Sequence, residues 1–563
     1  MHHHLSLRSK LIIMISVMAS LFLVALDQTI IATALGKIVE EFHSFDSLSW
    51  IVTAYLITTT ITVPIAGKLS DLFGRRTILL IGVAVFAIGS LLGGLSGNVT
   101  ELIAWRAFQG IGAGIITANA FTIVGDLFAA RERGKWQGLI GAVFGLSSVV
   151  GPLLGGWLTD GQAIAGLTTD WRWTFFINVP IGIVAFVMIA IFCPPLRHAA
   201  KAVIDYLGAV FLSIALAVLI LAVDNTETIF AGLMDATGLS LLWLRVIMFS
   251  IVAASIVGFI LAERRAKEPI LPLAFFKNRN FVILSVTAAL FGWAFMGSIL
   301  YLTQFNQQVF GASPTESGLM LLPMVAGIMA TSIGSGQIIA RTGRYKPFIV
   351  TGFIVSTVMM FFLTTLTPES SYAYEAVIMV ILGLGMGVAM PVMNLAIQNE
   401  FEQKDLGVAT SSNSLFRSLG STIGTAVFGA MLTAGILAQV TAIKDTDYIQ
   451  AIAQSPEAAQ IGSVDDANTL LTLNTPEVKE RITTTAEGAI AQSPLPTEAK
   501  EAAVTQFEDN QAEFAGKVTH AFSDSLQRIF IVATGLMIAS TVLIFALKER
   551  RLKAGAKATP GEM

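Results

Sequence analysis

The sequence predicts an all-α membrane protein in which two six-helix bundles are joined by two linker helices. Three observations predict this fold class. Of the 563 residues, 54% are hydrophobic and only 13% are charged, which is too apolar for an ordinary soluble domain. Apolar stretches long enough to cross roughly 30 Å of hydrocarbon as helix recur along the chain. The two halves also carry matching motifs at similar spacing.

The apolar stretches predict about fourteen spans. Six lie in the first half, at residues 11–35, 49–67, 77–97, 102–124, 136–158 and 173–194. Two linker spans follow, at 206–223 and 242–262. Six more lie at 281–305, 316–338, 347–366, 373–397, 408–434 and 525–547. The predicted domains are an N-terminal bundle over 1–200, linker helices over 201–275, and a C-terminal bundle over 276–563 with an extracytoplasmic insertion over 440–520 before its last helix. The first apolar run is too long for a signal-peptide core and is expected to remain as a span.

Positive charges in the short loops predict the orientation, because Lys and Arg accumulate on the cytoplasmic side of membrane proteins. Alternate loops are basic, at Arg8 and Lys10, Lys68 to Arg76, Arg131 to Lys135, Arg197 and Lys201, Arg264 to Arg279, Arg341 to Lys346, and Lys548 to Lys557. The loops between them are acidic. The loop from Glu400 to Asp405 is the exception, because the span count places it on the cytoplasmic side although its acids outnumber its single lysine. We expect a multi-pass protein of the bacterial cytoplasmic membrane with both termini in the cytoplasm.

Residues 440–520 differ from the rest of the chain. They are acidic, rich in Ala, Thr, Gln and Glu, and lack a membrane-length apolar run. The patches Pro476–Ala486 and Thr497–Phe514 have helical composition, so we interpret the segment as an extracytoplasmic cap or flap. The alternative is a solvated spacer without a part in function.

A charged turn from Gly67 to Arg76 follows the second span and recurs in weaker form from Gly336 to Lys346. Gly67 and Gly74 suit close helix packing and a sharp reversal, and Asp71 can accept hydrogen bonds from a neighbouring helix N-terminus.

A second motif, Gly110 to Gly114, recurs at Gly383 to Gly387 with nearly the same offset. The halves therefore repeat, an arrangement that transporters use to form a pathway between two bundles.

The charged turn resembles the loop signature of the major facilitator superfamily, and the resemblance covers nearly the whole chain apart from 440–520. It implies the major facilitator fold. In that family the turn acts as a conformational latch, and its arginine pairs with an acid at the cytoplasmic end of the fourth span. The resemblance implies as gate residues Gly67, Asp71, Gly74, Arg75, Arg76 and Asp126. Ala340 replaces the acid in the second copy, so the latch is expected to be asymmetric. The alternative is that these charges only fix the topology.

Asp27 lies toward the outer third of the first span. An ionisable side chain at that depth costs roughly 2.5 to 3.5 kcal/mol on insertion scales, so it is a candidate functional group facing the interior. Burial favours the neutral carboxyl, a property that a proton carrier needs. The segment Leu26 to Ile30 also resembles the first-span signature of the family's fourteen-span drug:proton antiporter branch. The alternative is an acid that only tethers helices.

Arg106 lies near the outer start of the fourth span, at a depth that matches Asp27. Its repeat counterpart is Met379, so the fold itself does not require a cation there. In the family this arginine belongs to the proton-coupling machinery. We expect Arg106 to modulate the acidity of Asp27, directly or through Gln109 and water. The alternative is a salt bridge that only holds two helices together.

The fifth span carries a run of small residues around a proline, namely Gly145, Gly151, Pro152, Gly155 and Gly156. Small residues permit close helix approach, and a proline bends a helix because it removes one hydrogen bond. The run resembles the antiporter motif that marks exporters in the family. The segment Trp171 to Pro180 resembles the same branch and is expected to be structural.

Several polar residues on otherwise apolar spans are candidates for lining a substrate cavity. They are Tyr55, Gln109, Gln304, Asn306, Gln307, Asn394, Gln398 and Arg417. Each could equally satisfy a neighbouring helix. For Arg417 we favour a structural pair with Glu400 or Glu402 over contact with a substrate.

Other classes of protein are disfavoured by what the sequence lacks. It has no GxxxxGK[ST] loop, no metal-spaced His/Cys cluster and no nucleophile elbow, so we expect neither ATP-driven transport nor an enzyme, and no metal or cofactor beyond the proton gradient. A net charge of −3 without a basic patch does not favour nucleic acid as a partner. The single cysteine, Cys193, excludes an internal disulfide framework.

Together these features predict a proton-coupled antiporter that exports hydrophobic or cationic amphipathic compounds by alternating access, as in multidrug efflux. Its expected partners are small amphipathic molecules or lipids, protons and membrane lipid, and it is expected to be a monomer. A lipid or glycolipid exporter of the same fold is the nearest alternative, followed by a proton-coupled nutrient importer and a non-transporting membrane sensor. The first half is expected to carry the latch and the proton chemistry, and the second half mainly cavity wall.

Overall fold

The structure is a computed structural model. It describes residues 6–42, 48–159, 161, 163–164, 166–194, 204–223, 226–312, 314–439, 443–453, 467–474, 476–494 and 496–552. Fourteen helices among them are long and apolar enough to cross a membrane, which agrees with the predicted number and with the all-α class.

The N-terminal bundle consists of α1 (Leu7–Phe42), α2 (Leu48–Phe73), α3 (Arg75–Gly94), α4 (Val99–Leu127), α5 (Ala130–Thr159), α6 (Trp173–Phe176) and α7 (Asn178–Phe192). A short antiparallel pair, β1 (Ala163–Ile164) and β2 (Leu167–Thr168), lies between α5 and α6. The linker helices are α8 (Tyr206–Val223), α9 (Thr226–Thr237) and α10 (Leu241–Arg265). The sixth predicted span, at residues 173–194, is divided in the structure into α6 and α7.

The C-terminal bundle begins after the 3₁₀ turn η2 (Leu273–Lys277). It consists of α11 (Arg279–Val309), α12 (Pro314–Met320), α13 (Leu322–Thr342), α14 (Lys346–Leu363), α15 (Tyr372–Glu400), η3 (Gln403–Asp405), α16 (Leu406–Leu437) and α22 (Thr497–Phe545). Before α22 lie α18 (Asp447–Ala453), α20 (Ala467–Leu473) and α21 (Pro476–Gln492).

Apolar packing forms one large buried cluster in each bundle. Large apolar side chains are also exposed around the circumference, for example Ile191, Leu242, Phe361 and Val542. A soluble domain rarely exposes so much apolar surface, whereas lipid can cover it.

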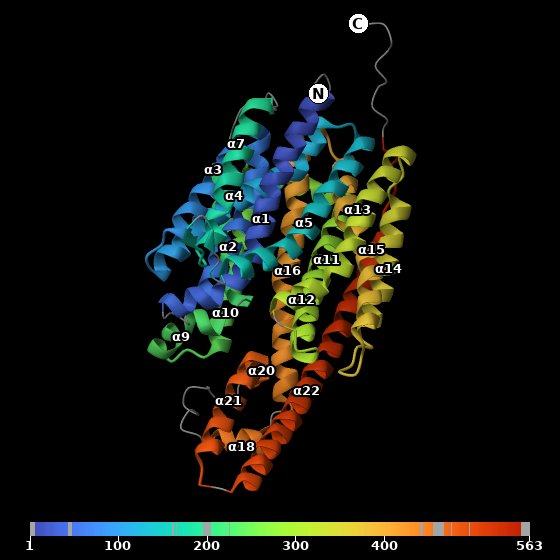
Figure 1. The fold of residues 1–563 in the computed structure, drawn as a ribbon. Coiled ribbons are helices and arrows are strands. Elements are labelled where there is room, and N and C mark those ends of the chain that lie inside the picture. The colour runs from blue at the N-terminus through green and yellow to red at the C-terminus, as the bar shows by residue number, and fades with distance from the viewer. Residues whose placement is uncertain are drawn as a thin grey trace, which may run out of the picture.

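The last helix is longer than predicted. The sequence places its span at 525–547, but α22 runs without a break for 49 residues from Thr497. Its first half packs against α18 and α21, where Tyr448 contacts Phe507 and Phe514 through ring pairs. The insertion at 440–520 and the last helix therefore overlap, and the described part of the insertion is a helical layer at one end of the molecule (Figure 1).

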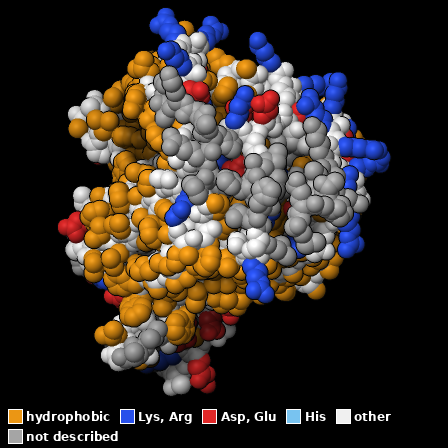
Figure 2. Space-filling model, turned by 90° about the horizontal axis from the view of Figure 1, so that it is seen from above, with side chains coloured by type: hydrophobic (Ala, Val, Ile, Leu, Met, Phe, Trp, Pro, Cys, Tyr) orange, Lys and Arg blue, Asp and Glu red, His pale blue; other side chains and the backbone are white. Residues whose placement is uncertain are grey.

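Both termini lie at the opposite end of the molecule from this layer (Figure 1). We call the end with the termini the termini face and the end with α18, α20 and α21 the distal face. Seen from the termini face, Lys and Arg side chains gather around the molecule (Figure 2). The basic side chains on this face agree with the predicted basic loops.

Candidate functional site

A buried polar cluster joins α1, α4 and α7 in the distal half of the N-terminal bundle. Arg106 Nη1 lies 2.5 Å from Asp27 Oδ2, and both side chains are almost completely buried. Gln109 Nε2 donates to Asp27 Oδ1 at 2.9 Å, and Arg106 donates to Gln109 Oε1 at 2.8 Å. Asn178 Nδ2 gives Asp27 a further hydrogen bond at 3.2 Å. The sequence predicted that Asp27 and Arg106 lie at matching depths, and in the structure they form a direct ion pair.

Aromatic and hydroxyl groups complete this cluster. The Arg106 guanidinium lies 4.2 Å from the ring centre of Tyr55, a cation–π distance. Ser90 accepts a hydrogen bond from Asn178 at 3.0 Å and donates to the Phe175 carbonyl at 2.9 Å. Tyr55, predicted to line a cavity, is instead fully buried against Arg106.

The Asp27 carboxylate thus accepts from one cation, Arg106, and from two amide donors, Gln109 and Asn178. Removing one member of a buried ion pair is costly because the other charge is left without compensation. Proton binding to Asp27 is therefore expected to weaken its bonds to α4 and α7 together.

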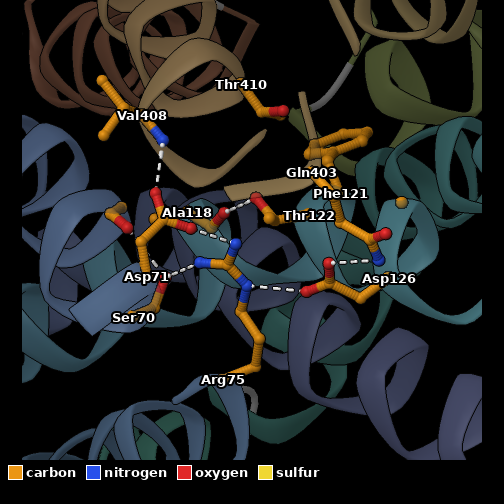
Figure 3. Close-up of polar contacts among 12 residues, drawn as sticks. Ser70, Asp71, Arg75, Ala118, Phe121, Thr122, Asp126, Gln403, Val408 and Thr410 are labelled. Atoms are coloured by element: carbon orange, nitrogen blue, oxygen red, sulfur yellow. Dashed lines mark hydrogen bonds and ion pairs between the residues drawn. The ribbon is translucent and has the colours of Figure 1, made fainter. Parts of the chain in front are cut away.

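A second buried cluster lies where the charged turn meets α4 and α16 (Figure 3). Arg75 Nε lies 2.8 Å from Asp126 Oδ2, and the same guanidinium also pairs with Asp71 and donates to Ser70 Oγ at 2.5 Å. Asp71 Oδ2 accepts a hydrogen bond from Val408 N, in the first turn of α16, at 3.1 Å. The predicted pairing of Arg75 with Asp126 and the predicted helix N-terminus beside Asp71 are both present.

Backbone geometry makes this close approach possible. Gly74 has φ of 96°, which L side chains rarely adopt. A Cβ atom on Gly407 would lie 2.6 Å from both Asp71 carboxylate oxygens and from Arg75 Nη1. Arg76 lies outside the cluster and donates to the Ala190 carbonyl of α7 at 2.5 Å.

Further hydrogen bonds near the termini face also join the two bundles. Gln403 donates to Asp126 at 3.3 Å, and Gln398 donates to the Phe121 carbonyl at 2.9 Å while accepting from Gln137 at 2.8 Å. Gln398, predicted to line a cavity, therefore ties α15 to α4 and α5. The bundles are held together at this face in the conformation described.

The second copy of the charged turn is held differently. Gly343 ends α13 with φ of 68°, and its carbonyl accepts from Leu552 N at 3.0 Å. The Leu552 carbonyl in turn accepts from Arg131 of α5 at 3.3 Å. The segment that follows α22 thus connects α13 of one bundle to α5 of the other through Leu552. In the first copy of the turn, the buried carboxylate of Asp71 makes the corresponding connection.

The small-residue run of α5 packs against three helices. A Cβ atom on Gly151 would overlap Thr29 of α1, whose hydroxyl donates to the Ser147 carbonyl at 3.0 Å. Gly145 faces Val325 of α13, and Pro152 faces Gly318 of α12. Farther along, the Gly155 and Gly156 carbonyls accept from the Thr159 hydroxyl at 2.7 and 3.0 Å. The run therefore seats α5 between the two bundles.

Most other cavity candidates have partners on neighbouring helices. Asn394 accepts from Asn413 at 2.9 Å, and Gln307 donates to Ser317 at 2.9 Å. Gln304 is half-buried. For Asn394 and Gln307 the geometry agrees with the alternative that they satisfy helix neighbours, and the role of Gln304 stays a prediction.

The pairing favoured for Arg417 is wrong. Glu400 contacts Asn278, Asn280 and Arg550, and Glu402 pairs with Lys404 at 3.2 Å. The Arg417 guanidinium, half-buried on α16, has no hydrogen-bond or ion-pair partner among the described residues. Its role as a cavity residue stays a prediction.

Comparison with known proteins decides the family. The sequence profile of the Major Facilitator Superfamily matches residues 17–425. The chain belongs to the Major Facilitator Superfamily. It is 38% identical over 451 residues to the multidrug transporter protein MdtP of Bacillus subtilis, covering 80% of each chain. It is 36% identical over 422 residues to multidrug resistance protein 3 of the same bacterium, covering 75% of this chain and 79% of the relative. The chain is thus a multi-pass membrane protein of the efflux-transporter type within this superfamily.

A solved structure shows the same fold. The human organic anion transporter MFSD10 matches with a TM-score of 0.59 and 13% identity, covering 95% of this chain and 99% of that one. At this identity the likeness concerns the major facilitator fold alone.

Sequence reasoning missed Ser90 and Asn178 as members of the Asp27 cluster. Asn178 stands inside the Trp171 to Pro180 segment, which was assigned a structural role, and Ser90 is a small polar residue in an apolar span with no distinguishing neighbour. It also missed Glu375, an acid just inside the start of a span. Within the described part of the chain, no group of three or more His, Cys, Asp or Glu residues is arranged to hold a metal ion.

Proposed function

We propose that this protein is a proton-coupled antiporter of the bacterial cytoplasmic membrane that exports hydrophobic or cationic amphipathic compounds. The observation that carries the proposal is the buried ion pair between Asp27 and Arg106, with two amide donors on the same carboxylate. Intramembrane ionisable residues are costly and mark functional sites. The names of the two Bacillus relatives support export of drugs as the direction and cargo.

In this proposal the termini face is cytoplasmic, and the structure is the state closed to the cytoplasm. Arg75, Asp71 and Asp126 hold that closure, because they fix the charged turn to α4 and to the first turn of α16. A proton that enters from the distal side binds the Asp27 carboxylate and removes its charge. Arg106 then loses its counter-charge, the hydrogen bonds from Gln109 and Asn178 weaken, and α1 can move relative to α4 and α7.

The cycle returns when the bundles rock and Asp27 faces the cytoplasm. There the proton leaves, the ion pair with Arg106 forms again, and substrate bound from the cytoplasm is carried outward. Because one carboxylate serves both steps, proton entry is coupled to substrate exit.

A lipid or glycolipid exporter of the same fold is the second candidate. Arg417 favours it, since a half-buried guanidinium without a described partner could be neutralised by an anionic headgroup. The two candidates share the same coupling site and differ in cargo.

The test is transport in proteoliposomes under an imposed pH gradient, with a panel of fluorescent dyes, cationic drugs and lipids. The wild-type protein is expected to move at least one class against its own gradient, and Asp27→Asn is expected to abolish that uphill flux. If the flux of every responsive substrate survived the substitution unchanged, the coupling assignment would be wrong.

A further inference from the structure

A second buried acid, which the coupling scheme above does not use, lies in the C-terminal bundle. Glu375 stands in the first turn of α15 and is completely buried. Its partner is Asn306 of α11, which is also completely buried. In the orientation that satisfies both groups, Asn306 Nδ2 donates to Oε1 and Oε2 of Glu375 at 2.9 Å each.

No cation compensates this carboxyl group among the described residues. The helices α5, α11, α13, α14 and α16 pack against α15, and none of them places a described Lys, Arg or His in an ion pair with Glu375. The phenol of Tyr372 is a titratable neighbour on the same helix. The charges nearby on the distal surface, Glu369 and His520, face each other at 3.8 Å and are exposed. A buried carboxylate without a cation is costly.

Asn306 can satisfy either protonation state of this acid. Its amide nitrogen donates to a carboxylate, and after rotation of the amide its oxygen accepts from a protonated carboxyl. The arginine that faces Asp27 can only donate. The pair of Glu375 and Asn306 can therefore take up and lose a proton while a hydrogen bond between the two side chains is kept.

The internal repeat relates the pair of Glu375 and Asn306 to the pair of Asp27 and Arg106 in the other bundle. In the N-terminal bundle the acid is on the first helix, at Asp27, and its partner Arg106 is on the fourth. In the C-terminal bundle the partner Asn306 is on the first helix, and the acid Glu375 is on the fourth, one helical turn from Met379, the repeat counterpart of Arg106. In its distal half each bundle thus has a buried polar link between its first and fourth helices, and the acid is on the first helix in one bundle and on the fourth in the other.

A cavity opens near this pair at the distal face. A cavity of about 330 Å³ is lined by Gln307, the residue next to Asn306, and by Phe310, with α22 forming another wall. Phe310 also contacts the ring of Tyr372, three residues before Glu375. The cavity therefore reaches α11 at Gln307 and Phe310, beside the pair, whereas Asn306 and Glu375 themselves stay buried.

We propose that Glu375 is a second proton-binding site, loaded from the distal side. The proton adds to one carboxyl oxygen, the Asn306 amide rotates to accept from it, and no covalent bond is otherwise made or broken. The proton is released when α11 and α15 move apart. This inference rests on the proposed proton-coupled function, but proton occupancy can be measured without transport.

The first experiment is infrared spectroscopy of the full-length protein in lipid nanodiscs without substrate, as a function of pH. Wild type near neutral pH is expected to show a protonated-carboxyl band that Glu375→Gln lacks. The control Glu369→Gln, which removes an exposed acid six residues away, should retain it. In Asn306→Ala the band is expected to persist at a shifted frequency. If Glu375→Gln and Asn306→Ala both left the spectrum unchanged, the proposal would be overturned.

The second experiment separates proton binding from simple tethering, with ethidium as the transported probe in proteoliposomes. Glu375→Gln keeps a hydrogen bond to Asn306 but cannot titrate, whereas Glu375→Leu loses both properties. The proposal expects Glu375→Gln to lose part of the dependence of flux on distal pH. A tether alone would leave Glu375→Gln like wild type and impair only Glu375→Leu, which would refute proton binding there. If Asp27→Asn retained uphill flux while the Glu375 band was present, the proposed coupling would fail and the proton site would stand.

Discussion

The two bundles treat their buried charges differently. In the N-terminal bundle Asp27 pairs with Arg106, and Arg75 pairs with two carboxylates. In the C-terminal bundle Glu375 faces only an amide, and Arg417 has no partner among the described residues. Paired charges fix one arrangement of helices, because separating them exposes an uncompensated charge. Charges without an ionic partner stay available to a proton or a ligand, so the second half offers more than the cavity wall that the sequence predicted.

The largest expected effect comes from making the N-terminal site resemble its counterpart. Arg106→Met places the repeat's own residue at this position and leaves Asp27 buried without a cation, which is expected to destabilise the fold by about 3 to 5 kcal/mol. The double variant Asp27→Asn, Arg106→Met should recover much of that stability. Thermal unfolding in detergent measures both. Equal stability of wild type and Arg106→Met would show that the ion pair contributes nothing to this bundle.

Opening the latch is expected to have the next largest effect. Asp71→Asn weakens the ion pair with Arg75 and the hydrogen bond from Val408 N. The population of the state open at the termini face should therefore rise about tenfold, which corresponds to about 1.4 kcal/mol in the free energy of opening. Ser411 is a buried residue of α16 that packs against Gly67 of the charged turn, so it is reachable only when this face opens. The measurement is the labelling rate of Ser411→Cys in a Cys193→Ser background. Arg344→Gln in the second copy is the matched control and should leave the rate unchanged. Labelling that did not respond to Asp71→Asn would contradict a latch at this position.

Arg417→Gln is expected to change cargo selectivity more than stability. Because the guanidinium has no described partner, its loss should change the free energy of unfolding by only about 0.5 kcal/mol. Uptake of anionic lipids or dyes should fall several-fold relative to cationic dyes in the same proteoliposomes. A large loss of stability with unaltered selectivity would indicate a structural cation instead.

Removing the distal layer should leave transport largely intact. Gln439, just beyond the end of α16, contacts Asp524 of α22 at 3.2 Å, so the chain can be rejoined across a deletion of residues 450–515. A transporter is expected to retain turnover, measured as dye flux, whereas a sensor would lose its function outright. Complete loss of flux in a well-folded deletion variant would favour the sensor.

The smallest expected effect is a pH-dependent contribution at the distal face. The hydrogen bond from Arg172 holds the pKa of Glu41 below its ordinary value. The pair therefore stabilises the fold above the unfolded pKa of about 4.3 and loses this contribution as the pH falls through the folded pKa. Both side chains are partly exposed, so the effect should be small. The difference in melting temperature between wild type and Glu41→Gln should shrink at acidic pH, and Glu227→Gln should show no such change.

Much of the fold and of the first site follows from sequence alone. Apolar runs locate the spans because hydrocarbon requires continuous helices. Asp27 and Arg106 are charged residues within those runs, and their matching depths predict that they lie close together. The pairing of Arg75 with Asp126 was predicted from the resemblance to the family.

Other features depend on tertiary packing and were not visible in the sequence. Glu375 stands two residues inside a predicted span, where its burial depends on how α11 and its neighbours pack over it. Gln398 and Tyr55 were placed on a cavity wall, but the approach of the helices buries them. The start of α22 was missed because the first half of this helix is polar, so hydropathy does not reveal it. That half is held by packing against α18 and α21.

The central claim is that Asp27 couples proton movement to transport through its bonds to Arg106, Gln109 and Asn178. The most direct measurement compares two modes of transport of ethidium by Asp27→Asn in proteoliposomes. The account predicts that exchange of dye at equal pH on both sides is retained, while accumulation driven by a pH gradient is lost. Retention of gradient-driven accumulation at the wild-type level would contradict it.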